Sequence, residues 1–198
     1  MDSKQHSAVF LDRDGTINIE KDYLVDKREF AFIPGAPEAI RALKRAGFLV
    51  VVVTNQSGIA RGYFSAAQVK RLHTYMQSQL QGYFTHVDAF YMCPHHPSAG
   101  SGPYTRACTC RKGEAGMLFD AAHDLNIDLA TSYMVGDKVA DLEAGFNAGC
   151  RSVLVRTGYG DETCQKPEVR KWLETERIAV CDNLSDAAQH ILTLSRKI

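Results

Sequence analysis

Two carboxylates, Asp12 and Asp14, directly follow the short apolar run Val9–Leu11. That run predicts a buried strand, and in an extended chain the side chains of residues two apart point the same way. If the strand continues through residue 14, both carboxylates project into one pocket and Arg13 turns away. Such a pair could hold a divalent cation, with one carboxylate acting as nucleophile and the other as proton donor. The alternative is a solvated turn, because Asp and Gly dominate turns.

A hydroxyl and a basic pair occupy two further positions that suit a phosphate. Thr54 ends the apolar run 49–53, where its hydroxyl and exposed backbone N–H groups could bind a phosphate oxygen. The alternative there is a polar loop that satisfies its own backbone. Arg111 and Lys112 precede a predicted helix, whose positive N-terminal end disfavours cations unless an anion lies between them. Otherwise the pair is an ordinary solvated surface, although the planar fork of Arg111 suits a second phosphate or a sugar hydroxyl.

A third carboxylate, Asp137, follows the apolar run Tyr133–Val135, which predicts another strand. Because the carboxyl ends of parallel strands share one rim of a sheet, we expect Asp137 beside Asp12. There it could complete a magnesium site, since Mg²⁺ is held by one or two carboxylates together with water and phosphate. The alternative is that Asp137 or Asp141 only caps the helix predicted from Ala140.

Three cysteines and two histidines gather in one long loop, 93–110, which is rich in Pro, Gly and Ser. They are Cys93, His95, His96, Cys108 and Cys110. Three thiolates with one imidazole form a ligand set of closed structural Zn²⁺ sites. The spacing departs from the usual C-x-x-C pattern, and the alternatives are free cysteines in a loose loop or a redox-active pair.

Apolar β-rich runs alternate with amphipathic segments, which predicts a parallel sheet covered by helices on both faces. The expected fold class is α/β, a doubly wound Rossmann-like sheet in a single domain over 1–198. Strands are predicted at Ala8–Leu11, Leu49–Thr54, Ala89–Met92, Tyr133–Val135, Ser152–Val155 and Ala179–Cys181. Helices are predicted at Pro37–Ala46, Ser65–Leu80, Glu114–Leu125, Ala140–Ala148 and Asn183–Leu194. The connections 18–34 and 93–110 are long but too short for a second domain, so any lid is built from loops.

The composition excludes several classes of partner. The 198 residues include 23 Lys+Arg and 23 Asp+Glu, a balance that gives no overall field toward nucleic acid or a membrane surface. The polar stretch 1–6 lacks the apolar core of a signal peptide, and no apolar run approaches the roughly 20 residues that span a bilayer. We therefore expect a cytoplasmic protein, most simply a monomer, without nucleic-acid or membrane partners. The scattered cysteines are expected to be apolar fillers or surface thiols: Cys150, Cys164 and Cys181.

Four motifs together resemble the signature of the haloacid dehalogenase superfamily of phosphatases, over about residues 8–155. In chain order they are the string FLDRDGT at 10–16, Thr54, Lys112 and the string GDKVAD at 136–141. Four motifs in this order, each beside its own predicted strand or helix, are much more specific than any one alone.

The resemblance implies a role for each motif residue. Asp12 is the nucleophile that forms an aspartyl-phosphate, and Asp14 protonates the leaving group and later activates water. Thr54 binds the transferring phosphoryl group, and Lys112 neutralises it. Asp141 supports the site by hydrogen bonding. A catalytic Mg²⁺ is implied, with the ligands Asp12, Asp14 and Asp137.

The cysteine loop resembles the zinc loop of the capless heptose bisphosphate and histidinol-phosphate phosphatases of this superfamily. That resemblance implies a structural Zn²⁺ with His95, rather than His96, as the imidazole ligand. The implied ligand set is Cys93, His95, Cys108 and Cys110. The implied substrate contacts are Glu20, Lys21, Asp22, Tyr23, Asn55, Gln56, Ser57, Arg111 and Lys138.

Within that group, the lack of a partner dehydratase domain favours a stand-alone phosphatase of the bacterial heptose-nucleotide pathway, which supplies the lipopolysaccharide core. The expected substrate is a small phosphorylated sugar, a heptose bisphosphate. One alternative is another phosphatase of the superfamily, acting on histidinol phosphate or on the 3′-phosphate of DNA. The neutral charge balance and the lack of a basic, aromatic-rich stripe count against DNA. The other alternative is a zinc-dependent interaction module that has lost catalysis, against which the intact motif residues argue.

Overall fold

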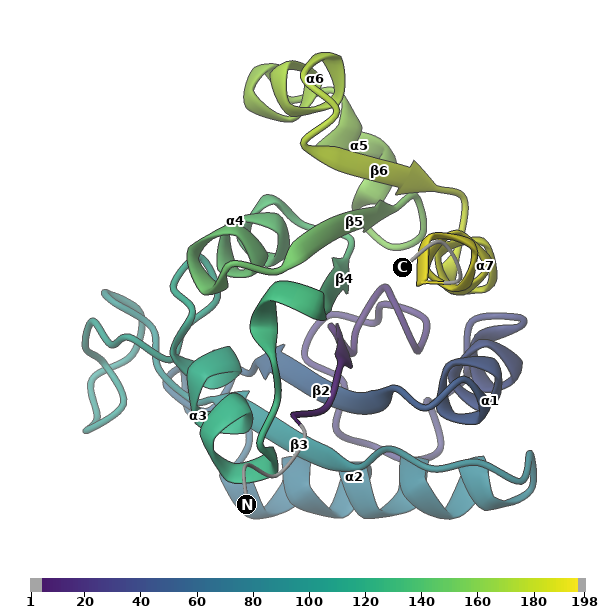
Figure 1. Ribbon diagram of the computed structural model, residues 1–198. Helices are drawn as coiled ribbons and strands as arrows, with labels where there is room; N and C mark the ends of the chain where they lie inside the picture. Colours follow the sequence, from purple (N-terminus) through teal and green to yellow (C-terminus); the bar gives the residue numbers. More distant parts are fainter. Residues whose placement is uncertain (1–4, 196–198) are drawn as a thin grey trace.

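Residues 5–195 are described by the computed structural model, and within them six strands form one parallel sheet (Figure 1). The strand order is β3-β2-β1-β4-β5-β6. The strands are β1 (Ala8–Leu11), β2 (Leu49–Asn55), β3 (Ala89–Cys93), β4 (Tyr133–Gly136), β5 (Arg151–Val155) and β6 (Ile178–Cys181). The order reverses at β1, which lies between β2 and β4, and such a switch point is where open α/β sheets bind ligands.

Helices cover both faces of the sheet (Figure 1). They are α1 (Ala36–Arg45), α2 (Ala66–Gln81), α3 (Gly116–Leu125), α4 (Val139–Ala148), α5 (Gly160–Cys164), α6 (Pro167–Glu174) and α7 (Leu184–Ser195), with a 3₁₀ turn at Leu129–Thr131. Side chains of α1, α2 and α7 pack in one core, and those of α3 and α4 pack in the other. The helix α6 contacts β6 at the edge of the sheet.

Strand β1 shows why its sequence is a continuous apolar run. Val9 and Leu11 join the core beneath α1 and α7, whereas Ala8 and Phe10 join the core beneath α3 and α4. All four side chains are fully buried. A central parallel strand covered on both faces has no solvent side, so every position is apolar until the strand ends.

The predicted fold class is confirmed, and the predicted element boundaries are close. Strand β1 coincides with its prediction, and each of the other strands extends one residue further at one end. The helices α5 and α6 were not predicted. The first spans only 5 residues and the second only 8, so each is too short for the sustained periodic pattern that identifies longer helices, although Val169, Trp172 and Leu173 of α6 do follow helical spacing.

The connection between β1 and α1, residues 12–35, contains neither a helix nor a named strand. Isolated bridges tie Asn18 to Asp14 and to Phe32, so this connection folds back over the end of β1. No helix in residues 5–195 combines the length and apolar character needed to cross a bilayer. Residues 1–4 of the polar N-terminal stretch, and 196–198 of the expected domain, lie outside the described residues.

Candidate active site

The carboxyl ends of β2, β1 and β4 bring the motif residues to one cleft. Asp12 follows β1, Thr54 belongs to β2 and Asp137 follows β4. A cavity of about 350 Å³ opens at this edge of the sheet. Its lining consists of Asp12, Asp14, Glu20, Asp22, Tyr23, Thr54, Asn55, Gln56, Ser57, Gly58, Arg111, Lys112, Lys138, Ala140, Asp141 and Tyr159. Of the residues predicted for this cleft, Lys21 and the fully buried Asp137 are absent from the lining.

Lys112 forms the central ion pair of the cleft. Its Nζ lies 2.6 Å from Oδ1 of Asp12 and 2.7 Å from Oδ1 of Asp141. Burial opposes the charge of Lys112, but the two carboxylates outweigh that effect and raise its pKa above the usual value. The backbone N–H of Lys112 donates to Oδ1 of Asn55 at 3.0 Å, which anchors the lysine to the end of β2. A cation therefore stays fixed beside Asp12.

Three carboxylates crowd around this lysine. Oxygen atoms of Asp12, Asp137 and Asp141 lie within 4.8 Å of one another, and all three residues are buried. Burial raises the pKa of Asp12 to about 6, against the opposing charge of Lys112. Burial, followed by the charge of Asp12, raises the pKa of Asp137 to about 8. Lys138 is the second cation near the cluster, with its Nζ 3.8 Å from Oδ2 of Asp137, but it also pairs with Glu20. The two lysines therefore face four carboxylates, and the cluster keeps a surplus of oxygen ligands that suits a divalent cation.

The two oxygens of Asp137 have different surroundings. Oδ2 accepts a hydrogen bond from the backbone N–H of Tyr159 at 2.8 Å, whereas Oδ1 is buried without a hydrogen-bond partner. A buried carboxylate oxygen without a partner is costly, and a bound cation would satisfy it. The turn after β1 passes so close that a Cβ at Gly15 would lie 2.3 Å from Oδ2. Gly15 also has φ 84, which favours glycine.

The structure corrects the predicted geometry of Asp14. Both Asp12 and Asp14 line the cavity and Arg13 does not, as expected, but β1 ends at Leu11 and the chain turns. The N–H groups of Ile17 and Asn18 bond to the Arg13 carbonyl in that turn.

The carboxylate of Asp14 is consequently held by Arg13, whose Nη2 lies 2.7 Å from Oδ2. Burial raises the pKa of Asp14, but the guanidinium outweighs it and holds that pKa below the usual range. Gln56 Nε2 donates to Asp14 at 3.1 Å and to Thr54 Oγ1 at 2.9 Å. The carboxyl cluster with metal-ligand spacing consists of Asp12, Asp137 and Asp141, and Asp14, also predicted as a ligand, lies outside that cluster.

The mouth of the cavity is formed by the connection after β1. Lys138 Nζ donates to Glu20 Oε2 at 3.0 Å, and Tyr159 Oη donates to Asp22 Oδ1 at 3.1 Å. Asp22 and Tyr23 have φ values of 43 and 62, and two consecutive non-glycine residues in this region indicate local strain. Tyr159 was missed in the sequence, where its position between Gly158 and Gly160, just after β5, was the available signal.

A second polar cluster joins the end of β3 to the loop 93–110. The Sγ–Sγ distances among its three cysteines are 3.3, 3.3 and 3.6 Å, and His95 Nδ1 lies 3.7 and 3.4 Å from two of the sulfurs. A tetrahedron with Zn–S bonds of ≈ 2.3 Å has edges of about 3.8 Å, so the cluster is close to that geometry. The cluster consists of Cys93, His95, Cys108 and Cys110.

The neighbouring imidazole of His96 is engaged elsewhere. Its Nδ1 accepts hydrogen bonds from the backbone N–H groups of Ser98 and Ala99.

Arg111 Nη1 donates to the carbonyl of His95 at 3.1 Å. The four-residue cluster therefore directly supports the arginine that lines the cavity.

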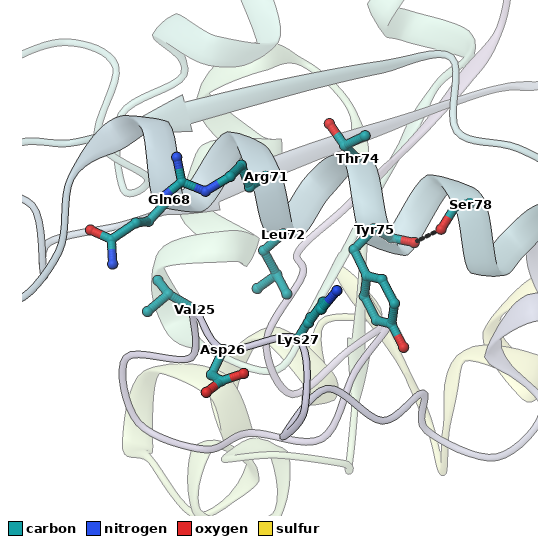
Figure 2. Close-up of a pocket in the computed structure, with 9 residues that line it drawn as sticks. All are labelled: Val25, Asp26, Lys27, Gln68, Arg71, Leu72, Thr74, Tyr75 and Ser78. Carbon is teal, nitrogen blue, oxygen red and sulfur yellow. Dashed lines mark hydrogen bonds between the residues drawn. The ribbon is translucent and has the colours of Figure 1, made fainter.

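A larger cavity, of about 710 Å³, lies between α2 and the segment 25–27 (Figure 2). Its lining is mixed in character, with Leu72 and Tyr75 beside Lys27 and Arg71. The only carboxylate in the lining is Asp26, which pairs with the neighbouring Arg28. The larger cavity thus lacks the clustered carboxylates of the cleft at β1.

The chain is similar to a family of known proteins. The family described as HAD-hydrolase-like matches residues 109–187. D-glycero-beta-D-manno-heptose-1,7-bisphosphate 7-phosphatase of Haemophilus ducreyi is 52% identical over 153 residues, which cover 76% of this chain and 84% of that protein. The enzyme of the same name from Escherichia coli (strain K12) is 48% identical over 158 residues, 79% of this chain and 82% of that protein.

Solved structures of heptose bisphosphate phosphatases are also similar to this chain. The D,D-heptose 1,7-bisphosphate phosphatase from B. bronchiseptica, complexed with magnesium and phosphate, is 38% identical with a TM-score of 0.79, covering 94% of this chain and 98% of that chain. The phosphatase of the same name from Burkholderia thailandensis is 33% identical with a TM-score of 0.66, over the same shares of the two chains.

The fold and the cleft at β1 define a phosphatase of the haloacid dehalogenase superfamily. With these identities over most of both chains, the protein belongs to the D-glycero-beta-D-manno-heptose-1,7-bisphosphate 7-phosphatase family.

Proposed function

We propose that this protein hydrolyses the 7-phosphate of D-glycero-D-manno-heptose 1,7-bisphosphate through an aspartyl-phosphate on Asp12. The observation that carries the proposal is the buried Asp12–Lys112 pair beside the surplus carboxylates of Asp137 and Asp141. The family relationship supplies the substrate. The further proposal is that the protein acts on a small sugar phosphate in bacterial heptose-nucleotide synthesis for lipopolysaccharide, in the cytoplasm and as a monomer.

Magnesium fits the cleft on this chain's own evidence. The unpartnered Oδ1 of Asp137 lies in a cluster of buried carboxylates, and Mg²⁺ prefers such oxygen ligands. We propose Asp12 and Asp137 as its carboxylate ligands, whereas the side chain of Asp14 is engaged by Arg13. When bound, Mg²⁺ would neutralise charge on the phosphate oxygens.

The residues of the cleft divide the reaction between them. A carboxylate oxygen of Asp12 attacks phosphorus and the bond from phosphorus to the sugar oxygen breaks, while a protonated Asp14 donates its proton to that oxygen. Because Arg13 holds Asp14 ionised in the free protein, Asp14 must take up this proton when the negatively charged phosphate binds beside it. Lys112 and the hydroxyl of Thr54 bind the charged equatorial oxygens. Asp14 then takes a proton from water, which attacks the phosphorus, frees Asp12 and releases inorganic phosphate.

Recognition of the sugar and of the second phosphate is assigned to the mouth of the cavity. Arg111 offers a planar guanidinium that can bind a second phosphate through two hydrogen bonds. The remaining proposed substrate contacts are Glu20, Lys21, Asp22, Tyr23, Asn55, Gln56, Ser57 and Lys138. Among these, Lys21 rests on the family resemblance alone, because it does not line the cavity.

The cluster of Cys93, His95, Cys108 and Cys110 is proposed as a structural Zn²⁺ site. Three thiolates and one imidazole complete a tetrahedron, which leaves no open position for a substrate. Through the His95–Arg111 contact and the short link to Lys112, the metal would order the segment that carries both cations.

The experiment that tests the proposed function is a phosphate-release assay with Mg²⁺ on three substrates: heptose 1,7-bisphosphate, histidinol phosphate and a 3′-phosphorylated DNA. Phosphorus NMR of the heptose product should show that the 1-phosphate remains. Preference for histidinol phosphate or DNA would replace the proposed substrate. No turnover of any phosphomonoester would favour a non-catalytic zinc-dependent module.

A further inference from the structure

The buried guanidinium of Arg13 connects Asp14 to a histidine outside the cavity. Arg13 Nε and Nη2 donate to Asp14, and Nη2 also donates to the Leu24 carbonyl at 3.2 Å. The remaining nitrogen, Nη1, lies 3.3 Å from Nε2 of His73. Because a guanidinium carries only donors, Nε2 of His73 must be the acceptor. All three nitrogens of this fully buried side chain therefore have partners.

His73 is held in place for that contact. It lies on α2, is 6% exposed and stacks on Phe90 with ring centroids 4.6 Å apart and an interplanar angle of 19°. Burial, followed by the neighbouring charge of Arg13, lowers the pKa of His73 to about 3. The imidazole is consequently neutral near pH 7 and keeps a lone pair for Arg13.

The chain of contacts gives His73 control over the orientation of Asp14. Replacing His73 by a side chain without an acceptor leaves Nη1 of the buried Arg13 without a hydrogen-bond partner. This arrangement is costly, and the guanidinium relieves it by shifting. Such a shift moves the carboxylate bound to Arg13. A displacement of about 1 Å at a reacting group can cost about 10²-fold in rate.

We propose that His73 is a positioning residue for the acid–base chemistry of Asp14, acting through Arg13. The proposal rests on the proposed function, in which Asp14 protonates the leaving sugar oxygen. His73 does not line the cleft at β1, so its effect passes through the buried arginine.

The test compares two leaving groups by kcat/KM, which reports steps up to formation of the aspartyl-phosphate. A sugar alkoxide needs protonation by Asp14, whereas the phenolate of p-nitrophenyl phosphate needs little. His73→Leu should lower kcat/KM for the heptose bisphosphate by at least about tenfold, and for p-nitrophenyl phosphate by less than about threefold. His73→Gln should restore most of the sugar activity, because its amide oxygen can accept from Nη1.

Two controls separate positioning from loss of stability and from failure of the proposed function. Met76→Ala, in the buried core one turn along α2, should lower Tm and leave the ratio of the two kcat/KM values unchanged. Asp14→Asn should show the strongest leaving-group dependence, and its absence would reject Asp14 as the acid, whereas the proposed function itself is tested by the phosphate-release assay. With Asp14→Asn behaving as expected, equal losses on both substrates in His73→Leu would overturn the positioning role.

If His73→Leu does not fold, His73→Asn, whose amide is too short to reach Nη1, takes its place with the same expectations.

Discussion

Lys112 lies between Asp12 and Asp141, with its Nζ 2.6 Å and 2.7 Å from their carboxylates. Asp12 follows β1, whereas Asp141 belongs to the first turn of α4 and also accepts the Lys138 N–H at 3.0 Å. The lysine itself lies two residues after Cys110 of the metal-compatible cluster. This contact therefore joins the proposed nucleophile, the start of α4 and the cysteine loop.

Asp12→Asn is expected to abolish turnover while it largely preserves the fold and weak substrate binding. An amide cannot attack phosphorus, but it fills nearly the same volume, and Lys112 keeps its contact with Asp141. We expect less than about 1% of the wild-type kcat, which corresponds to at least about 2.7 kcal/mol of barrier. Asp26→Asn, which alters an acid of the larger cavity, is the matched control and should keep full activity. Higher residual turnover in Asp12→Asn would rule out Asp12 as nucleophile.

Loss of the proposed zinc site should lower both stability and activity while leaving the Mg²⁺ requirement in place. The two metals would occupy separate sites with different ligands, thiolate and imidazole for Zn²⁺ and carboxylate oxygens for Mg²⁺. Cys108→Ser should reduce Tm and kcat, whereas Cys181→Ser, outside the cluster, should change neither substantially. Elemental analysis of protein purified without chelator should give one zinc per chain. Zinc-free protein with full stability would contradict the assignment.

The selectivity of the enzyme should depend on Arg111. A bisphosphate offers a second dianion to the guanidinium, whereas the amine of histidinol phosphate is repelled by it. We expect heptose 1,7-bisphosphate to exceed histidinol phosphate in kcat/KM by at least ~100-fold, about 2.7 kcal/mol. Arg111→Ala should reduce this ratio mainly by weakening the bisphosphate. Arg106→Ala, an exposed arginine of the same loop, should leave the ratio unchanged. An unaltered preference in Arg111→Ala would show that selectivity arises elsewhere.

Mg²⁺ binding should weaken as the pH falls from 8 to 6. Burial raises the pKa of Asp137 to about 8 and that of Asp12 to about 6, so protons compete with the cation in this range. Competition by one proton predicts a rise in the apparent Kd of up to about tenfold per pH unit. Titration of Mg²⁺ by calorimetry at pH 6, 7 and 8 measures this change.

The same pKa shifts set the sign of the stability change in metal-free protein. A carboxyl whose pKa is raised on folding stabilises the fold below its unfolded pKa, and that contribution is lost as the pH rises through the folded value. Tm without Mg²⁺ should therefore fall from pH 6 to pH 8, and the gain in Tm on adding Mg²⁺ should be largest at pH 8. A gain in Tm that does not vary with pH would contradict the assignment of these carboxylates.

The sequence by itself determined the sheet and the positions of its catalytic motifs. Apolar runs and helical periodicity are local properties, and they located every strand because a buried strand must be apolar along its length. The polar residues at the carboxyl ends of β1, β2 and β4 could also be identified in the sequence. They were expected to lie close together because parallel strands place their carboxyl ends on one rim. Short helices such as α5 and α6 lack a sustained signal, because the 8 residues of α6 place only Val169, Trp172 and Leu173 at helical spacing.

Tertiary structure decided what each of those side chains contacts. The partners of Asp14 are Arg13, Asn18 and Gln56, and that choice follows from the turn that ends β1 at Leu11. The placement of His73 against Arg13 depends on how α2 packs on the sheet. A sequence pattern reports which face of an element is buried, whereas hydrogen-bond partners depend on how distant elements pack together, and no local pattern encodes that packing.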